Sequence, residues 1–196
     1  MDAGEPYTLK EEMTRPNGNL QKMSEISEVN NCLSRKAYIP TKRSIVISKV
    51  RKPAPINCIF NSKEEPGRLI NLKSRNVVKG YIQVPGVDST KSLLPVASDT
   101  STRILIDMNY VWVAEVYDVE SSSLHPNMEV EMFIEWHEVI VDLGITTKEF
   151  MEEYCILIGN SMYGNVDAVI LWLIMLAKYL INSFKLKGGR QTNVFL

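Results

Sequence analysis

The chain has 196 residues, enough for one domain with a core and a tail, and its hydrophobic fraction of 45% and charged fraction of 23% are those of an ordinary globular protein. A net charge of −1 argues against a general nucleic-acid binder. The three widely spaced cysteines, Cys32, Cys58 and Cys155, fit neither a zinc site nor a disulfide framework, and they favour a reducing compartment.

The charges are distributed unevenly along the chain. Residues 31–79 hold twelve basic and two acidic residues, whereas residues 80–153 hold three basic and fourteen acidic residues. A strongly basic section is therefore followed by a strongly acidic section. Two such sections in one nearly neutral chain can pair with each other, or they can favour head-to-tail contacts between copies.

Residues 1–36 are polar and show no sustained apolar period. Such a segment cannot bury enough surface to offset the entropy of ordering it, so we predict a flexible N-terminal arm with a short helix near residues 20–29. The first residues contain no basic segment followed by an apolar run, and no signal peptide is expected.

Segments rich in β-branched and aromatic residues, separated by proline and glycine, predict β-strands through the middle of the chain. They are residues 43–50, 56–60, 68–72, 77–84 and 103–119. Residues 128–136 alternate between apolar and mostly acidic side chains, which predicts a half-buried antiparallel strand. Its acidic face carries Glu129, Glu131 and Glu135, which we expect to face solvent or a basic partner and take as candidates for self-association.

Two helices are predicted in the C-terminal third. The capping-box pattern of residues 146–149 begins a helix that runs to about residue 158, and a second helix covers residues 166–184. Its apolar run, residues 168–177, is too short for a bilayer, which needs about 20 residues, so we predict a central core helix. An oligomer contact or a membrane-surface contact remains open for this helix.

The expected fold class is therefore α+β, with an antiparallel β-sheet packed by two C-terminal helices. The flexible arm, residues 1–36, precedes a single domain of residues 37–187, and residues 188–196 form a tail.

Residue patterns that carry catalysis are missing from the sequence. His137 and Glu138 begin like a zinc-protease motif, but Val141 stands where a second histidine is needed. The sequence has neither a P-loop nor a G-x-G-x-x-G motif, and the carboxylates lack the loop spacing of a calcium site. The sequence thus predicts a protein that is not an enzyme, with no catalytic residues, no metal site, no cofactor and no small-molecule substrate.

The basic section predicts a surface that binds phosphates or anionic lipid head groups. Its candidate residues are Arg35, Lys36, Lys42, Arg43, Lys49, Arg51 and Lys52. The alternative is a solvated face that pairs with the chain's own acidic section, and the two readings stand equal at this point.

Residues 115–126, with the order Tyr117-Asp118-x-Glu120-Ser before a proline-containing turn, resemble the strand-and-turn segment of rhabdovirus matrix proteins. The resemblance covers about forty residues. It implies a virion protein that self-associates, links the nucleocapsid to the membrane, and binds nucleoprotein or RNA as well as anionic lipid.

The leading hypothesis is therefore a viral matrix-like structural protein, found in the virion and in the host cytoplasm or nucleus, associated with membranes and not secreted. One alternative is a viral movement or nucleic-acid-binding protein, because residues 104–107 resemble a hydrophobic segment ending in aspartate in plant virus movement proteins. A small enzyme is the remaining alternative.

Overall fold

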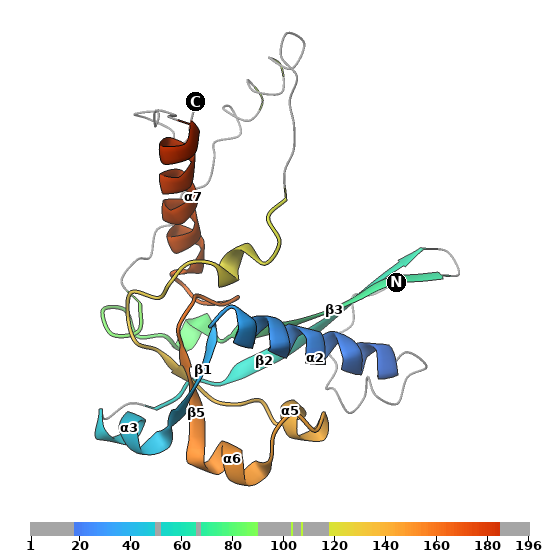
Figure 1. Cartoon of the computed structure of the whole chain (residues 1–196), viewed down its shortest axis with the longest axis vertical. Coiled ribbons are helices and arrows are strands. Elements are labelled where there is room, and N and C mark those ends of the chain that lie inside the picture. Colours follow the sequence, from blue (N-terminus) through green and yellow to red (C-terminus); the bar gives the residue numbers. More distant parts are fainter. Residues whose placement is uncertain are drawn as a thin grey trace.

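The computed structural model describes residues 18–49, 52–65, 68–89 and 118–184, together with the single residues Arg103 and Asp107. Helices and antiparallel strands are mixed along the chain (Figure 1). The strands are β1 (Tyr38–Lys42), β2 (Ile56–Glu65), β3 (Arg68–Val78), β4 (Phe133–Ile134) and β5 (Tyr154–Ile158). The helices are α2 (Gly18–Ser34), α3 (Arg43–Ser48), α5 (Val139–Asp142), α6 (Lys148–Glu153) and α7 (Ala168–Phe184), with the 3-10 turns η1 (Gly80–Ile82) and η2 (Ser122–Leu124).

The core surrounds a three-stranded sheet in the order β1-β5-β4. The central strand β5 pairs antiparallel with both neighbours, so that Tyr38 lies opposite Ile158 and Ile134 lies opposite Ile156. Ile134 and Ile156 are fully buried, and Trp136 packs edge-on against Tyr38. Aromatic and branched apolar side chains thus fix the strands by the surface that they remove from water.

The second sheet is the long hairpin β2–β3, and α2 lies along it (Figure 1). Buried polar contacts hold the helix in place: the Gln21 side-chain amide donates to Ser74 Oγ at 2.8 Å, and the Ser74 amide donates to Ser24 Oγ at 2.9 Å. Each buried polar atom that finds such a partner avoids the cost of being left without one. Residues 18–34 are therefore a packed helix that includes the short helix predicted near residues 20–29, and this part of the predicted arm is not flexible; residues 1–17 lie outside the described residues.

Three predicted elements have a different secondary structure. The strand expected at residues 77–84 ends at Val78, as the end of β3, and is followed by η1. Residues 43–48, expected as a strand, form α3, in which only Val46 is buried while Ile47 is 72% exposed. The edge of β5 is already occupied by β1, so β-branched residues alone do not make a strand here. The helix expected to run to residue 158 ends at Glu153, and the apolar run after it is β5. A short apolar run fits a buried strand as well as a helix, which is why periodicity misassigned it.

The C-terminal helix α7 projects away from the sheets (Figure 1). Only Ala168 and Leu171 of its residues are buried, and Tyr179 and Phe184 are about 60% exposed. The prediction of a central core helix is therefore wrong, because an unbroken apolar run does not show which element will cover it. None of the described helices combines the length and the apolar content needed to cross a membrane.

The predicted strand at residues 128–136 is much shorter, since only β4 is hydrogen-bonded as a strand. Phe133, on the expected acidic face, is buried against Val46 and Cys155. The segment is covered on both faces only around Phe133 and Ile134, which the alternating pattern did not indicate, whereas Glu129 and Glu131 are exposed as predicted. The predicted strand at residues 103–119 and the tail at residues 188–196 lie almost entirely outside the described residues.

Candidate nucleic-acid interface

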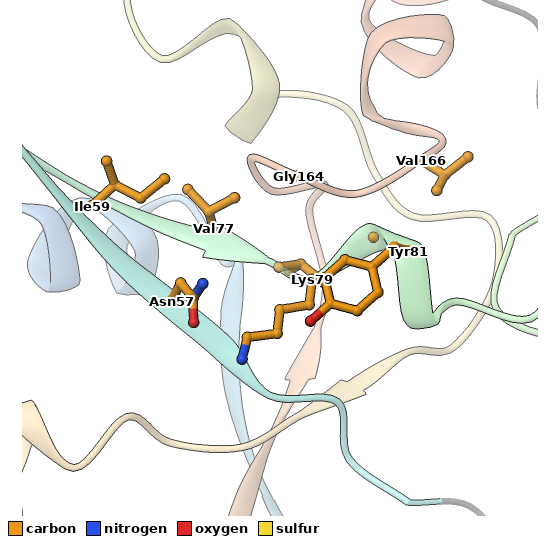
Figure 2. Close-up of a pocket in the computed structure, with 9 residues that line it drawn as sticks. Asn57, Ile59, Val77, Lys79, Tyr81, Gly164 and Val166 are labelled. Carbon is orange, nitrogen blue, oxygen red and sulfur yellow. The ribbon is translucent and has the colours of Figure 1, made fainter. Parts of the chain in front are cut away.

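A hollow of about 440 Å³ lies where β3 ends (Figure 2). Asn57 and Ile59 of β2 and Val77 of β3 form one wall, and next to it lie Tyr81, which belongs to η1, and Lys79, which directly precedes η1. The segment that leads into α7 closes the opposite side. We call this cavity the Tyr81 hollow.

The alternation of side chains along the hairpin places this wall. Cys58 lies opposite Asn76 in the register, and both side chains face α2, where the Cys58 thiol donates to Asn76 Oδ1 at 2.9 Å. Asn57 lies opposite Val77, one residue along each strand, so their side chains fall on the other face of the hairpin. One face of the hairpin is thus used for packing against α2, and the other lines the hollow.

Two glycines let the chain segments approach closely at the base of the hollow. Gly164 has a φ of 79°, and a Cβ atom there would lie 2.1 Å from the Val78 carbonyl oxygen. A Cβ atom on Gly80 would lie 2.1 Å from the Gly164 carbonyl oxygen. The Val78 amide donates to the Tyr163 carbonyl at 2.8 Å, so β3 and the segment before α7 are joined directly. Only glycine permits this contact.

The side chain of Gln83, the residue directly after η1, holds this turn in place. This side chain is 8% exposed, its Oε1 accepts from the Val166 amide at 2.8 Å, and its Nε2 donates to the Asp88 carbonyl at 3.1 Å. The oxygen of this side-chain amide therefore joins η1 to the segment that leads into α7, and its nitrogen joins η1 to the segment around Asp88. The turn that presents Tyr81 is held by these bonds, although Tyr81 itself is 83% exposed.

A second hollow of about 350 Å³ lies on the other side of η1. Lys52, Ile82 and Val84 are among the residues that line it. We use the name η1 ridge for η1 together with the two lysines that flank it, Lys52 and Lys79. Within the described ranges neither lysine takes part in an ion pair.

The chemistry of the ridge is that of binding. A lysine ammonium group attracts phosphate, and an exposed tyrosine ring offers a face on which a base can stack. The described residues that line the Tyr81 hollow include no acid, histidine, cysteine or serine, and Lys79 and Tyr81 are their only ionisable side chains. Elsewhere in the described ranges, no three His, Cys, Asp or Glu side chains gather into a group that could hold a metal ion.

Three of the predicted anion-binding residues instead pair with the chain's own carboxylates. The Arg43 guanidinium binds Glu135 through both of its terminal nitrogens, Lys49 pairs with Glu131, and Lys42 lies 3.5 Å from Glu153. The hydrogen bonds that Arg43 donates to Glu135 raise the pKa of Arg43 above its ordinary value, although partial burial opposes the change. Internal pairing, the alternative left open by the sequence, applies to these residues.

The other predicted cations are dispersed. Arg35 Nη1 lies 3.0 Å from His125 Nε2, and Lys36 is exposed in the turn after α2. Arg51 lies outside the described residues, and only Lys52 reaches the η1 ridge. The anion-binding role of the seven residues stays a prediction, and the six of them that the structure describes have different surroundings.

The acidic candidates for self-association are also engaged within the chain. Glu131 and Glu135 are the partners of Lys49 and Arg43. Glu129 is exposed and has an interaction within the chain as well. Their proposed contacts with a second copy have no support in this arrangement, and that role stays a prediction.

Sequence reasoning counted Lys79 in the basic section but did not single out Lys79, Tyr81 or Asn57 as site residues. A usable signal was present, because Lys79-Gly80-Tyr81 places an aromatic residue beside a cation, but these residues lay inside the segment predicted as the strand of residues 77–84. The contribution of Asn57 and Val166 could not be read in this way, since the hollow joins segments that lie far apart in the sequence.

Comparison with known proteins identifies the family. The family model described as "Reverse transcriptase (RNA-dependent DNA polymerase)" matches residues 41–191. The chain is 28% identical over 189 residues to the retrovirus-related Pol polyprotein from transposon TNT 1-94 of Nicotiana tabacum, covering 95% of this chain and 14% of that protein. It is 27% identical over 141 residues to the polyprotein from transposon RE2 of Arabidopsis thaliana, covering 70% of this chain and 9% of that protein.

The corresponding polyprotein from transposon RE1 of Arabidopsis thaliana is 26% identical over 141 residues. This chain therefore spans only a small part of the length of these relatives. No solved structure matches the chain.

These matches overturn several predictions. The segment that resembles rhabdovirus matrix proteins, residues 115–126, lies inside the region that the reverse transcriptase model covers, and the resemblance is too short to outweigh it. The matrix-like structural role, its nucleoprotein and membrane partners, and the expectation of a non-enzymatic protein without a small-molecule substrate are therefore wrong, because the family is one of polymerases, which use nucleotides. Since the family model matches well over half of its residues, the chain belongs to the reverse transcriptase (RNA-dependent DNA polymerase) family.

Proposed function

We propose that this chain serves in RNA-templated DNA synthesis, and that its described part holds the nucleic acid. The observation that carries the proposal is the match of residues 41–191 to the reverse transcriptase family. Because the chain spans 14% or less of its relatives, the polymerase reaction, its nucleotide substrates and its nucleic-acid partners all belong to this proposal.

The η1 ridge gives the proposal a physical basis. Lys52 and Lys79 flank one turn, and within the described ranges neither ammonium group is neutralised by a carboxylate. Such groups gain from contact with phosphates because binding releases the counterions condensed on the nucleic acid. The ridge separates two hollows, so a strand that crosses it can meet a lysine on each side.

Divalent cations supply the remaining chemistry in polymerases, where they bridge carboxylates and substrate phosphates. The described residues do not assemble a group of side chains suited to that task. No step of nucleotide transfer is therefore assigned to them. Their cationic, aromatic and apolar side chains support the binding of the template and primer.

The binding of an RNA–DNA hybrid by the full chain tests this function. Fluorescence anisotropy of a labelled hybrid should show saturable binding at low salt. Affinity should fall about tenfold between roughly 50 and 200 mM salt if two lysines contact phosphates. The absence of saturable binding at the lower salt concentration would overturn the proposal.

A non-nucleic polyanion provides the control for general charge attraction. Unlabelled hybrid should displace the labelled hybrid at a lower concentration of negative charge than polyglutamate does, because the ridge also offers a stacking ring and apolar walls. Equal displacement by both polyanions would show that the chain does not recognise nucleic acid.

A further inference from the structure

We propose that the Tyr81 hollow is a subsite for one unpaired nucleotide of a nucleic-acid strand, whose base stacks on Tyr81 and whose phosphate meets Lys79. This inference rests on the proposed function and adds the form of nucleic acid that the site takes. It is carried by the arrangement of the ring, the ammonium group and the hollow between the hairpin and the segment before α7 (Figure 2).

The Tyr81 ring is exposed on a turn that hydrogen bonds hold in place. Tyr81 is 83% exposed, yet its turn is fixed, because the Ile82 amide donates to the Lys79 carbonyl at 3.0 Å and the Gln83 amide donates to the Gly80 carbonyl at 3.1 Å. Buried Gln83 then ties this turn to Val166. A large aromatic side chain that is exposed on a fixed turn is already arranged for a ligand, so little ordering is needed when a base stacks on it.

The positive charge beside the ring comes from Lys79. The Lys79 side chain lies beside the Tyr81 ring and extends along the hollow toward Asn57 (Figure 2). Among the described residues that line the hollow, Lys79 is the only charged one. One ammonium group matches the single charge of a phosphodiester. A free nucleoside triphosphate carries several charges and would need more cations than these lining residues provide.

The Tyr81 hollow suits an unpaired base and not a base inside a duplex. The bases inside a duplex are stacked on one another, so their faces are closed to a tyrosine ring. The hollow is an open depression of about 440 Å³, and its apolar side chains Ile59, Val77 and Val166 can contact a base from one side. The side-chain amide of Asn57 offers donors and an acceptor to the edge of such a base.

The test compares Tyr81→Ala with the wild-type chain on three labelled probes: single-stranded RNA, an RNA–DNA hybrid with an RNA overhang, and a blunt hybrid. Loss of stacking should weaken binding of the first two by about fivefold to a hundredfold, and that of the blunt hybrid much less. Tyr81→Phe should restore the binding of single-stranded RNA, since the ring is kept. Tyr179→Ala, a change of another exposed tyrosine on α7, should leave all three affinities within about twofold of wild type.

The outcomes separate this inference from the proposed function. If the wild-type chain binds the probes and Tyr81→Ala binds single-stranded RNA equally well, or loses all three probes to the same extent, the subsite is wrong while the nucleic-acid role stands. If the wild-type chain binds none of them, the proposed function itself fails. Displacement of single-stranded RNA by millimolar dATP through Tyr81 would overturn the assignment to a strand, and resistance to dATP supports it.

Discussion

Arg43 and Lys79 are cations that each directly follow a β-strand, yet the fold places them in opposite situations. Arg43 follows β1 and is bound to Glu135, with a distance of 2.9 Å between Nη1 and Oε1, while its Nε donates to the Met151 carbonyl at 2.9 Å. Lys79 follows β3 and, within the described ranges, has no carboxylate partner. The comparison teaches that charge density along a sequence does not show which charges remain available to a ligand.

The largest expected effect is a loss of stability at the contact between β3 and the segment before α7, beneath the η1 ridge. Gly164→Ala should lower the free energy of unfolding by about 3 kcal/mol or more, because it combines a positive φ with a Cβ atom 2.1 Å from the Val78 carbonyl oxygen. Urea denaturation followed by circular dichroism would measure the change.

Gly144 supplies the matched control for that measurement. Its φ of 71° is similar, but a Cβ atom there meets nothing within 4 Å. Gly144→Ala should therefore cost only the conformational strain, about 1 kcal/mol. Equal losses in the two variants would show that the close contact beneath the ridge does not stabilise it.

A second test concerns the packed face of the same hairpin. Burial raises the pKa of the Glu25 carboxyl, and neighbouring Glu28 raises it further, against hydrogen bonds from Asn76 and Cys58. A carboxyl whose pKa is higher in the folded chain favours folding when protonated. This contribution is complete below the unfolded pKa of about 4.5 and is lost as the pH rises through the folded pKa.

Glu25→Gln should therefore reduce the loss of stability between acid and neutral pH, by about 1.4 kcal/mol for each unit by which the pKa is raised. Urea denaturation over a series of pH values would measure it. Glu153→Gln, a change of an exposed carboxyl, should keep the wild-type pH dependence. If the stability of Glu25→Gln changed with pH in the same way as that of wild type, this would contradict the burial of the Glu25 carboxyl between α2 and the hairpin.

A third test removes the ion pair between Arg43 and Glu135. Arg43→Met should lower the free energy of unfolding by about 1 kcal/mol, a modest loss because the Arg43 and Glu135 side chains are 27% and 38% exposed. Lys79→Met should change it by less than about 0.5 kcal/mol. A double-mutant cycle of Arg43 with Glu135 would isolate the pairing, and a coupling energy of zero would show that Arg43 is as available as Lys79.

The sequence predicted some of these features for sound physical reasons. Prolines, glycines and β-branched runs placed predicted strands within β2 and at both ends of β3. The predicted capping box at residues 146–149 lies one residue before the observed cap, in which the Phe150 amide donates to Thr147 Oγ1 at 3.2 Å at the start of α6. Strands and caps are local features, so neighbouring residues suffice to indicate them.

The features that the sequence missed depend on contacts between distant segments. Residues 154–158 became a strand because β1 and β4 lie on both sides of them, and α7 stayed outside the core although it is the most apolar segment. The η1 ridge and the two hollows beside it bring together residues near 52, 80 and 165. Residue patterns did not show this meeting point, and the short resemblance at residues 115–126 led to the wrong family.

The salt dependence of RNA–DNA hybrid binding tests the central claim most directly, since its slope counts the phosphates that the protein contacts. The slope of log affinity against log salt should fall in magnitude by about 0.9 in Lys79→Met, because one contact is lost, and it should stay at the wild-type value in Arg43→Met. An unchanged slope in Lys79→Met together with a reduced slope in Arg43→Met would contradict the account, because the paired cation would then be the one that holds the nucleic acid.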